Sequence, residues 1–156
     1  MRHEAKQSKQ WRNRSRTLAD VLLYENPPLI ARLCRKEGMS ESEAKTAFAD
    51  TLKFLYLCGT SEENFVPTAK IDAVWHHFIL FTAAYADFCL TFFGKFIHHI
   101  PAEAQSEGDY RSNCSKCSSC EGGGTGRSIE PGSLPTLEYT VNVARNRFGE
   151  LSSNWS

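Results

Sequence analysis

Four histidines and a cysteine are concentrated in one apolar stretch of this sequence, together with an aspartate at helical spacing. Asp72 and His76 are four residues apart, so on a helix they would share a face. The Asp72 carboxylate could then hold the imidazole by one nitrogen and leave the other to a metal ion. Cys89, His98 and His99 follow in the same stretch. A thiolate, two imidazoles and an open or carboxylate position would suit zinc or another divalent transition metal.

The same residues also allow less specific interpretations. The spacing of His76, Cys89 and His98 is not a standard zinc pattern, so His76 could simply be a packed histidine and Cys89 a small buried hydrophobe. In an extended segment His98 and His99 point to opposite sides, so one of them would face inward. A thiol enzyme would use Cys89 as nucleophile, His76 or His98 as base and Asp72 to orient the base. The predicted position of Cys89 near a helix C-terminus disfavours this chemistry, because a helix N-terminus is where a thiol pKa is lowered.

A second cluster consists of Cys114, Cys117 and Cys120, each separated from the next by two residues. Three thiolates at this spacing could hold zinc or part of an iron–sulfur cluster, but a fourth ligand would have to come from elsewhere. The run lies in a segment rich in glycine and serine. A flexible spacer with incidental thiols and a thiol–disulfide exchange site therefore remain alternatives.

The hydrophobic pattern predicts an all-α fold, a small bundle of about five or six short helices. Capping residues and glycines mark where most of these helices start and stop. Six helices are expected. Their approximate ranges are 18–25, 27–38, 40–59, 71–81, 82–92 and 135–149. The fourth and fifth could also be one helix bent near Thr82, which otherwise caps the fifth. His77 is expected on the surface or behind His76.

The composition divides the chain into four parts. Residues 1–16 are basic and are expected to be a flexible tail, an organelle transit peptide or an arm that contacts phosphates. Residues 17–101 form the predicted helical core domain. Residues 102–133 are a low-complexity segment of serine, glycine and cysteine that is expected to be a disordered insertion. Residues 134–156 are predicted to return as a C-terminal helix that packs on the core.

Charge and composition exclude several classes of protein. The 156 residues carry a formal net charge of zero, so no overall field attracts nucleic acid or an anionic membrane. No apolar run reaches the roughly 20 residues of a membrane helix, and the N-terminus lacks the apolar centre of a secretory signal. Six cysteines without such a signal predict a reducing compartment, the cytoplasm. Contact with nucleic acid is expected only through the basic N-terminal arm.

The string IDAVWHHFIL at 71–80, the Phe-Gly pair at 93–94 and the string FIHHIP at 96–101 resemble the glycine-rich domain-containing protein-like family of bacteria and plants. The resemblance implies that the polar motif positions matter: His76, Cys89, His98 and His99. It also implies that the cysteine run is a short form of the family's glycine- and cysteine-rich segment. Members often carry a second histidine where this chain has Phe78. No biochemical activity follows from the resemblance.

These observations predict a small cytoplasmic metal-binding or interaction module with an unknown protein partner and no membrane association. His76, Cys89 and one of His98 and His99 would bind the metal, with Asp72 behind His76. One alternative is a metal- or thiol-dependent enzyme that uses His76, Cys89 and His98. Another is a structural or adaptor protein in which the motif only builds an aromatic core.

Overall fold

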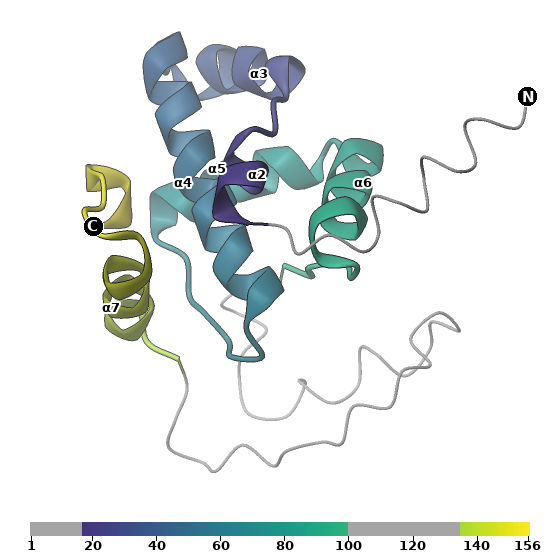
Figure 1. The fold of residues 1–156 in the computed structure, drawn as a ribbon. Coiled ribbons are helices and arrows are strands. Elements are labelled where there is room, and N and C mark those ends of the chain that lie inside the picture. Colours follow the sequence, from purple (N-terminus) through teal and green to yellow (C-terminus); the bar gives the residue numbers. More distant parts are fainter. Residues whose placement is uncertain (1–16, 100–134) are drawn as a thin grey trace, which may run out of the picture. The chain divides into compact units, whose positions relative to one another are not determined.

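The computed structural model describes residues 17–99 and 135–156, and this part of the chain is all-α (Figure 1). The described residues form six α-helices and one short 3-10 helix, with no strand among them. The predicted fold class is therefore confirmed. The predictions for segments 1–16 and 102–133 concern residues outside the described part. Of the described residues, 17–97 and 135–156 belong to one compact unit, which holds all of these helices.

The helices begin largely where their capping residues predict. They are α2 (Leu18–Leu22), α3 (Pro27–Glu37), α4 (Glu41–Thr60), α5 (Ala69–Ile79), α6 (Thr82–Phe93), α7 (Leu137–Phe148) and η4 (Ser153–Trp155). The first three caps each accept a backbone N–H through the side chain: Thr17 from Asp20, Asn26 from Leu29 and Ser40 from Glu43. These bonds satisfy amide groups that have no partner within the helix, which is why such residues define a helix start.

The junction between α5 and α6 confirms two separate helices over one bent helix, but the predicted cap is wrong. The two helices are separate and bent by 108°. Thr82 is the first residue of α6 and not its cap; the cap is Phe81, which makes no side-chain capping bond. Backbone bonds hold the corner instead, from Phe81 N–H to the Phe78 carbonyl at 3.0 Å and from Tyr85 N–H to the Phe81 carbonyl at 2.8 Å. Within the described residues no single helix has the length and apolar character of a membrane span, although α5 and α6 pass that test as a bent pair.

Helix α4 is the centre of the compact unit and packs against α2, α3, α5, α6 and η4. Its length of 20 residues corresponds to about 30 Å at 1.5 Å per residue. Apolar side chains on several of its faces are buried, as expected for a central helix: Ala44, Ala47, Phe48, Leu52, Phe54, Leu55 and Leu57. The helix therefore provides the surface on which α5 is held.

An aromatic cluster fills the corner between α5 and α6. Phe78 is fully buried and its ring lies 5.1 Å from Tyr85, 5.3 Å from Phe48, 5.4 Å from Phe88 and 5.8 Å from Tyr24. Most of these pairs are edge-to-face, the geometry that the ring quadrupoles favour by about 0.5–1.5 kcal/mol a pair. The cluster thus fixes the angle between the two helices.

The C-terminal segment is attached to α4 through a buried carboxylate. Asp50 is only 1% exposed and accepts hydrogen bonds from Ser152 Oγ at 2.6 Å, Asn154 Nδ2 at 2.8 Å and Lys53 Nζ at 3.1 Å. Burial raises the pKa of Asp50, but these three donors outweigh it, so the pKa lies below the ordinary carboxyl value. Thr68 Oγ also donates to the Asn154 carbonyl at 2.6 Å. The end of the chain is therefore held by both α4 and the start of α5.

Asp50 should make the stability of this protein depend on acid pH. Its pKa is lowered by folding, so the carboxylate stabilises the folded state above the unfolded pKa of about 3.9 and loses that effect as the pH falls through the folded pKa. We expect Asp50→Asn to lower the free energy of unfolding by about 2–4 kcal/mol at pH 7, because buried donors lose their charged acceptor. Urea unfolding of both proteins from pH 7 to pH 2.5 should show the difference shrinking with acidity. A constant difference would contradict this role.

Candidate metal centre

Helix α5 presents Asp72 and His76 on the face opposite its buried stripe. Thr68 caps the helix by accepting the Ile71 N–H at 3.3 Å. The apolar stripe consists of Ile71, Val74, Trp75 and Phe78, all at most 5% exposed. Because this stripe fixes the rotation of the helix, the side chains of Asp72 and His76 remain 34% and 54% exposed.

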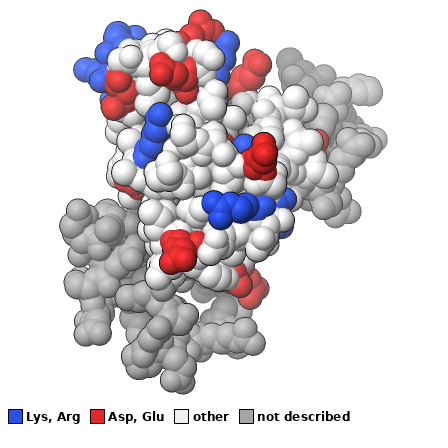
Figure 2. All heavy atoms as spheres, turned by 90° about the vertical axis from the view of Figure 1, so that its left-hand side faces the viewer, with Lys and Arg blue, Asp and Glu red and all other residues white. Residues whose placement is uncertain are grey.

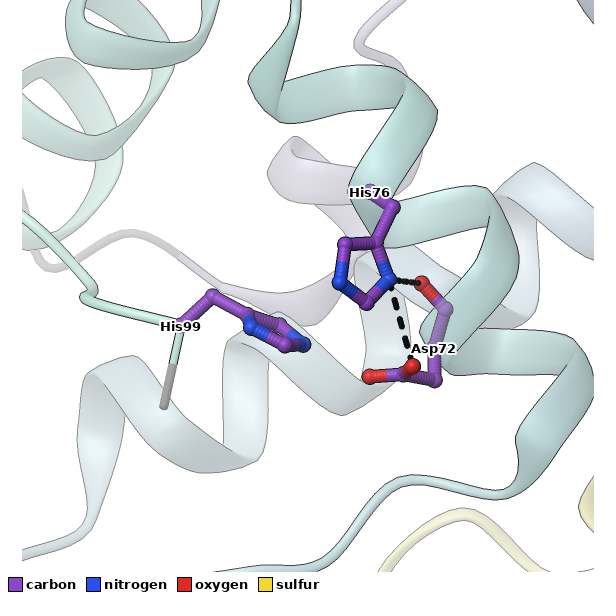
Figure 3. A group of neighbouring side chains, drawn as sticks. All are labelled: Asp72, His76 and His99. Carbon is purple, nitrogen blue, oxygen red and sulfur yellow. Dashed lines mark hydrogen bonds and ion pairs between the residues drawn. The ribbon is translucent and has the colours of Figure 1, made fainter. Parts of the chain in front are cut away.

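His76 is oriented through its Nδ1 atom. Nδ1 lies 2.8 Å from the backbone carbonyl oxygen of Asp72 and 3.2 Å from its carboxylate Oδ2 (Figure 3). A carbonyl only accepts hydrogen bonds, so Nδ1 carries the proton and Nε2 has the lone pair when the ring is neutral. The sequence predicted that the Asp72 carboxylate would orient this ring; the structure shows that the carbonyl of the same residue is the nearer acceptor.

His99 is the third member of the group drawn in Figure 3. Asp72, His76 and His99 each offer one ligand atom, and these atoms lie within 4.8 Å of one another. A tetrahedral zinc ion with bonds of 2.0–2.1 Å holds its ligand atoms roughly 3.4 Å apart, so a modest closing of the side chains would complete such a site. His98 is exposed and His99 half-buried, which agrees with the alternation expected of an extended segment.

Cys89 lies outside this group. Cys89 is fully buried in α6, and neither it nor His98 belongs to the metal-compatible group found among the described residues. Burial raises the pKa of the Cys89 thiol, so it is protonated at neutral pH. The predicted site at Cys114, Cys117 and Cys120 falls outside the residues that the structure describes and stays a prediction.

His77 bridges two helices. Arg32 Nε donates to its Nδ1 at 3.0 Å, and its Nε2 donates to Glu37 Oε1 at 2.7 Å. Since the guanidinium can only donate, Nδ1 accepts and the proton is on Nε2. The His77 side chain is only 16% exposed. This histidine, which the sequence placed at the surface or behind His76, links α3 to α5.

Tyr85 is a buried polar residue of α6 that the pattern of candidate ligands did not include. Its hydroxyl accepts a hydrogen bond from Trp75 Nε1 at 2.9 Å and donates one to the Ile97 carbonyl at 2.7 Å. Tyr85 is 1% exposed. A tyrosine at a buried helical position needs a hydrogen-bond partner for its hydroxyl. This requirement could have indicated from the sequence that Tyr85 has a structural role.

A family match covers the helices that carry this group. The sequence model of a family described as UCP032817-like matches residues 16–118, more than half of the 156-residue chain. No curated protein and no solved structure matches the chain. The expected resemblance to the glycine-rich domain-containing protein-like family is wrong, because the matching family is a different one. Much of the string that suggested it consists of apolar positions buried in α5, where core packing restricts the choice of residue.

The two adjacent histidines should respond differently to substitution. We expect His77→Ala to lower the free energy of unfolding by about 1–2 kcal/mol, because Arg32 and Glu37 lose their common partner in a partly buried position. His76→Ala should change it by less than about 0.5 kcal/mol in the absence of metal, since its side chain is half exposed. Urea unfolding of the three proteins in the presence of a chelator measures both. Equal losses would contradict the bridging role of His77.

Proposed function

Because this chain belongs to the UCP032817-like family, whose name states no activity, we propose a function from the geometry of the site: it binds a divalent transition metal ion through Asp72, His76 and His99. The convergence of two imidazoles and a carboxylate is the observation that supports this proposal. Imidazole and carboxylate ligands suit zinc and its first-row neighbours.

The three ligands have distinct roles in this proposal. Nε2 of His76 and one ring nitrogen of His99 bind the ion, while the Asp72 backbone carbonyl keeps the Nδ1–H of His76 in place. The Asp72 carboxylate, at the longer distance of 3.2 Å, is then the group that turns towards the metal. Asp72 thus supplies both a ligand and, through its backbone, the orienting acceptor that metal-binding histidines usually have.

Three protein ligands leave at least one coordination position for a further group. In an interaction module this position would take a side chain of a partner protein. Charges of both signs are interspersed on the face shown in Figure 2, in keeping with the formal net charge of zero. The partner would be selected by its ligand to the metal.

An enzyme is the second candidate, supported by the same open position. A zinc ion with three protein ligands lowers the pKa of a bound water and turns it into a nucleophile. The thiol variant of this idea has less support, since a buried Cys89 with a raised pKa is a poor nucleophile. Hydrolysis of activated esters by the zinc-loaded protein, abolished in His76→Ala, would favour the enzyme over the interaction module.

Zinc titration of the full chain with a competing chromophoric chelator tests the proposal. We expect one site in the parent protein. His76→Ala, His99→Ala and Asp72→Asn should each weaken the affinity by more than the roughly 10–100-fold that the loss of an outer partner costs. Asp72→Asn retains the backbone carbonyl, so a loss in this variant assigns the carboxylate to the metal.

Two variants serve as controls for this titration. His77→Ala removes a neighbouring histidine without touching the group, and a triple serine variant removes Cys114, Cys117 and Cys120; both should retain zinc with the parent affinity. Loss of binding in the triple serine variant, with full binding in His76→Ala, would overturn the proposal and assign the metal to the cysteine run.

A further inference from the structure

The two bonds made by the Tyr85 hydroxyl join α5, α6 and the segment that carries His99. Trp75, one residue before His76 on α5, donates to this hydroxyl at 2.9 Å, and the hydroxyl donates to the Ile97 carbonyl at 2.7 Å. We infer that Tyr85 is a positioning residue for His99: its hydroxyl fixes the histidine arm, defined as residues 95–99, relative to α5. This inference rests on the proposed metal site and adds a residue that does not itself touch the ion.

Packing holds the Tyr85 ring so that its hydroxyl has little freedom. The ring lies 5.1 Å from Phe78 and 5.2 Å from Phe96, and both contacts are edge-to-face. Tyr85 and Trp75 are 1% and 5% exposed, so water does not compete freely for their polar atoms. A shielded hydrogen bond of this kind is electrostatically stronger than one at the surface.

The fixed carbonyl of Ile97 limits where His99 can lie. The Ile97 side chain is itself 7% exposed, so both its backbone and its side chain are held by the core. Two residues of trans peptide allow the Cα atom of His99 to lie at most about 7.6 Å from that of Ile97. Because Trp75 and His76 are neighbours on one helix, the bonds of Tyr85 connect the helix of His76 to Ile97, which precedes His99 by two residues.

Tyr85→Phe isolates this effect, because it keeps the ring and removes only the hydroxyl. The Ile97 carbonyl then loses its donor, and the arm gains conformations in which His99 lies away from the metal. A ligand that spends less time in place has a lower effective concentration, so the affinity for zinc should fall by roughly 10-fold. Tyr24→Phe is the matched control, since the Tyr24 ring also packs on Phe78 but its hydroxyl is not bonded to the arm.

A double-mutant cycle on the full chain distinguishes positioning from general damage. Zinc affinity is measured for the parent, Tyr85→Phe, His99→Ala and the double variant. We expect the roughly 10-fold effect of Tyr85→Phe to disappear when His99 is already alanine. An equal loss in both backgrounds, or an equal loss in Tyr24→Phe, would overturn the inference while leaving the metal site intact. Absence of zinc binding by the parent would instead overturn the proposed function.

The positioning role of Tyr85 can also be tested in the metal-free protein. Backbone order parameters from nitrogen-15 relaxation report the motion of His98 and His99 directly. In the parent they should be near the value of about 0.85 for rigid backbone, and in Tyr85→Phe they should fall towards 0.6 or below, with residues of α4 unchanged. Equal order parameters in the two proteins would overturn the inference whether or not zinc binds.

Discussion

The burial of one face of α5 against the core is the constraint on which the rest of this structure depends. Val74, Trp75 and Phe78 are held by α4 and by the aromatic cluster at the corner with α6. Their packing fixes the rotation of α5, and the opposite face then projects Asp72 and His76 outward. The rotation of α5 also determines where its two histidines point. His76 joins the proposed metal group, while His77, 100° further round the helix, forms the bridge to α3.

Two groups of buried hydrogen bonds fix how the packed elements are connected. The Tyr85 hydroxyl connects α5 to the segment that follows α6, and the Asp50 carboxylate connects α4 to the C-terminal turn. Each is almost fully buried, so a loss of any one partner would leave a polar atom without compensation. The buried indole N–H of Trp155 also lies close enough to the Asp50 carboxylate to lower its pKa.

Much of the fold could be predicted from the sequence because helix ends have local signals. Asn26 before two prolines and Ser40 with Glu43 specify their helices through bonds to neighbouring residues. The corner at Phe81 has no such signal, because backbone bonds and tertiary aromatic contacts hold it. Asp50 was missed for a related reason: two of its three donors, Ser152 and Asn154, are about a hundred residues away along the chain.

The site was only partly predictable. Helical spacing alone brought Asp72 and His76 together, and alternation in an extended segment anticipated that His98 and His99 would differ in exposure. The pattern could not distinguish a thiol that faces a core from one that faces a metal, so Cys89 was grouped with the histidines. Its burial depends on how α6 turns against α4, which is a tertiary property.

X-ray absorption spectroscopy of the zinc-loaded full chain tests the central claim most directly, because sulfur and nitrogen ligands differ in distance and scattering. We expect nitrogen and oxygen neighbours at about 2.0–2.1 Å with the outer-shell pattern of imidazole, and no sulfur neighbour. A sulfur shell at about 2.3 Å would contradict the claim, because Asp72, His76 and His99 contain no sulfur and the metal would then be bound by cysteine.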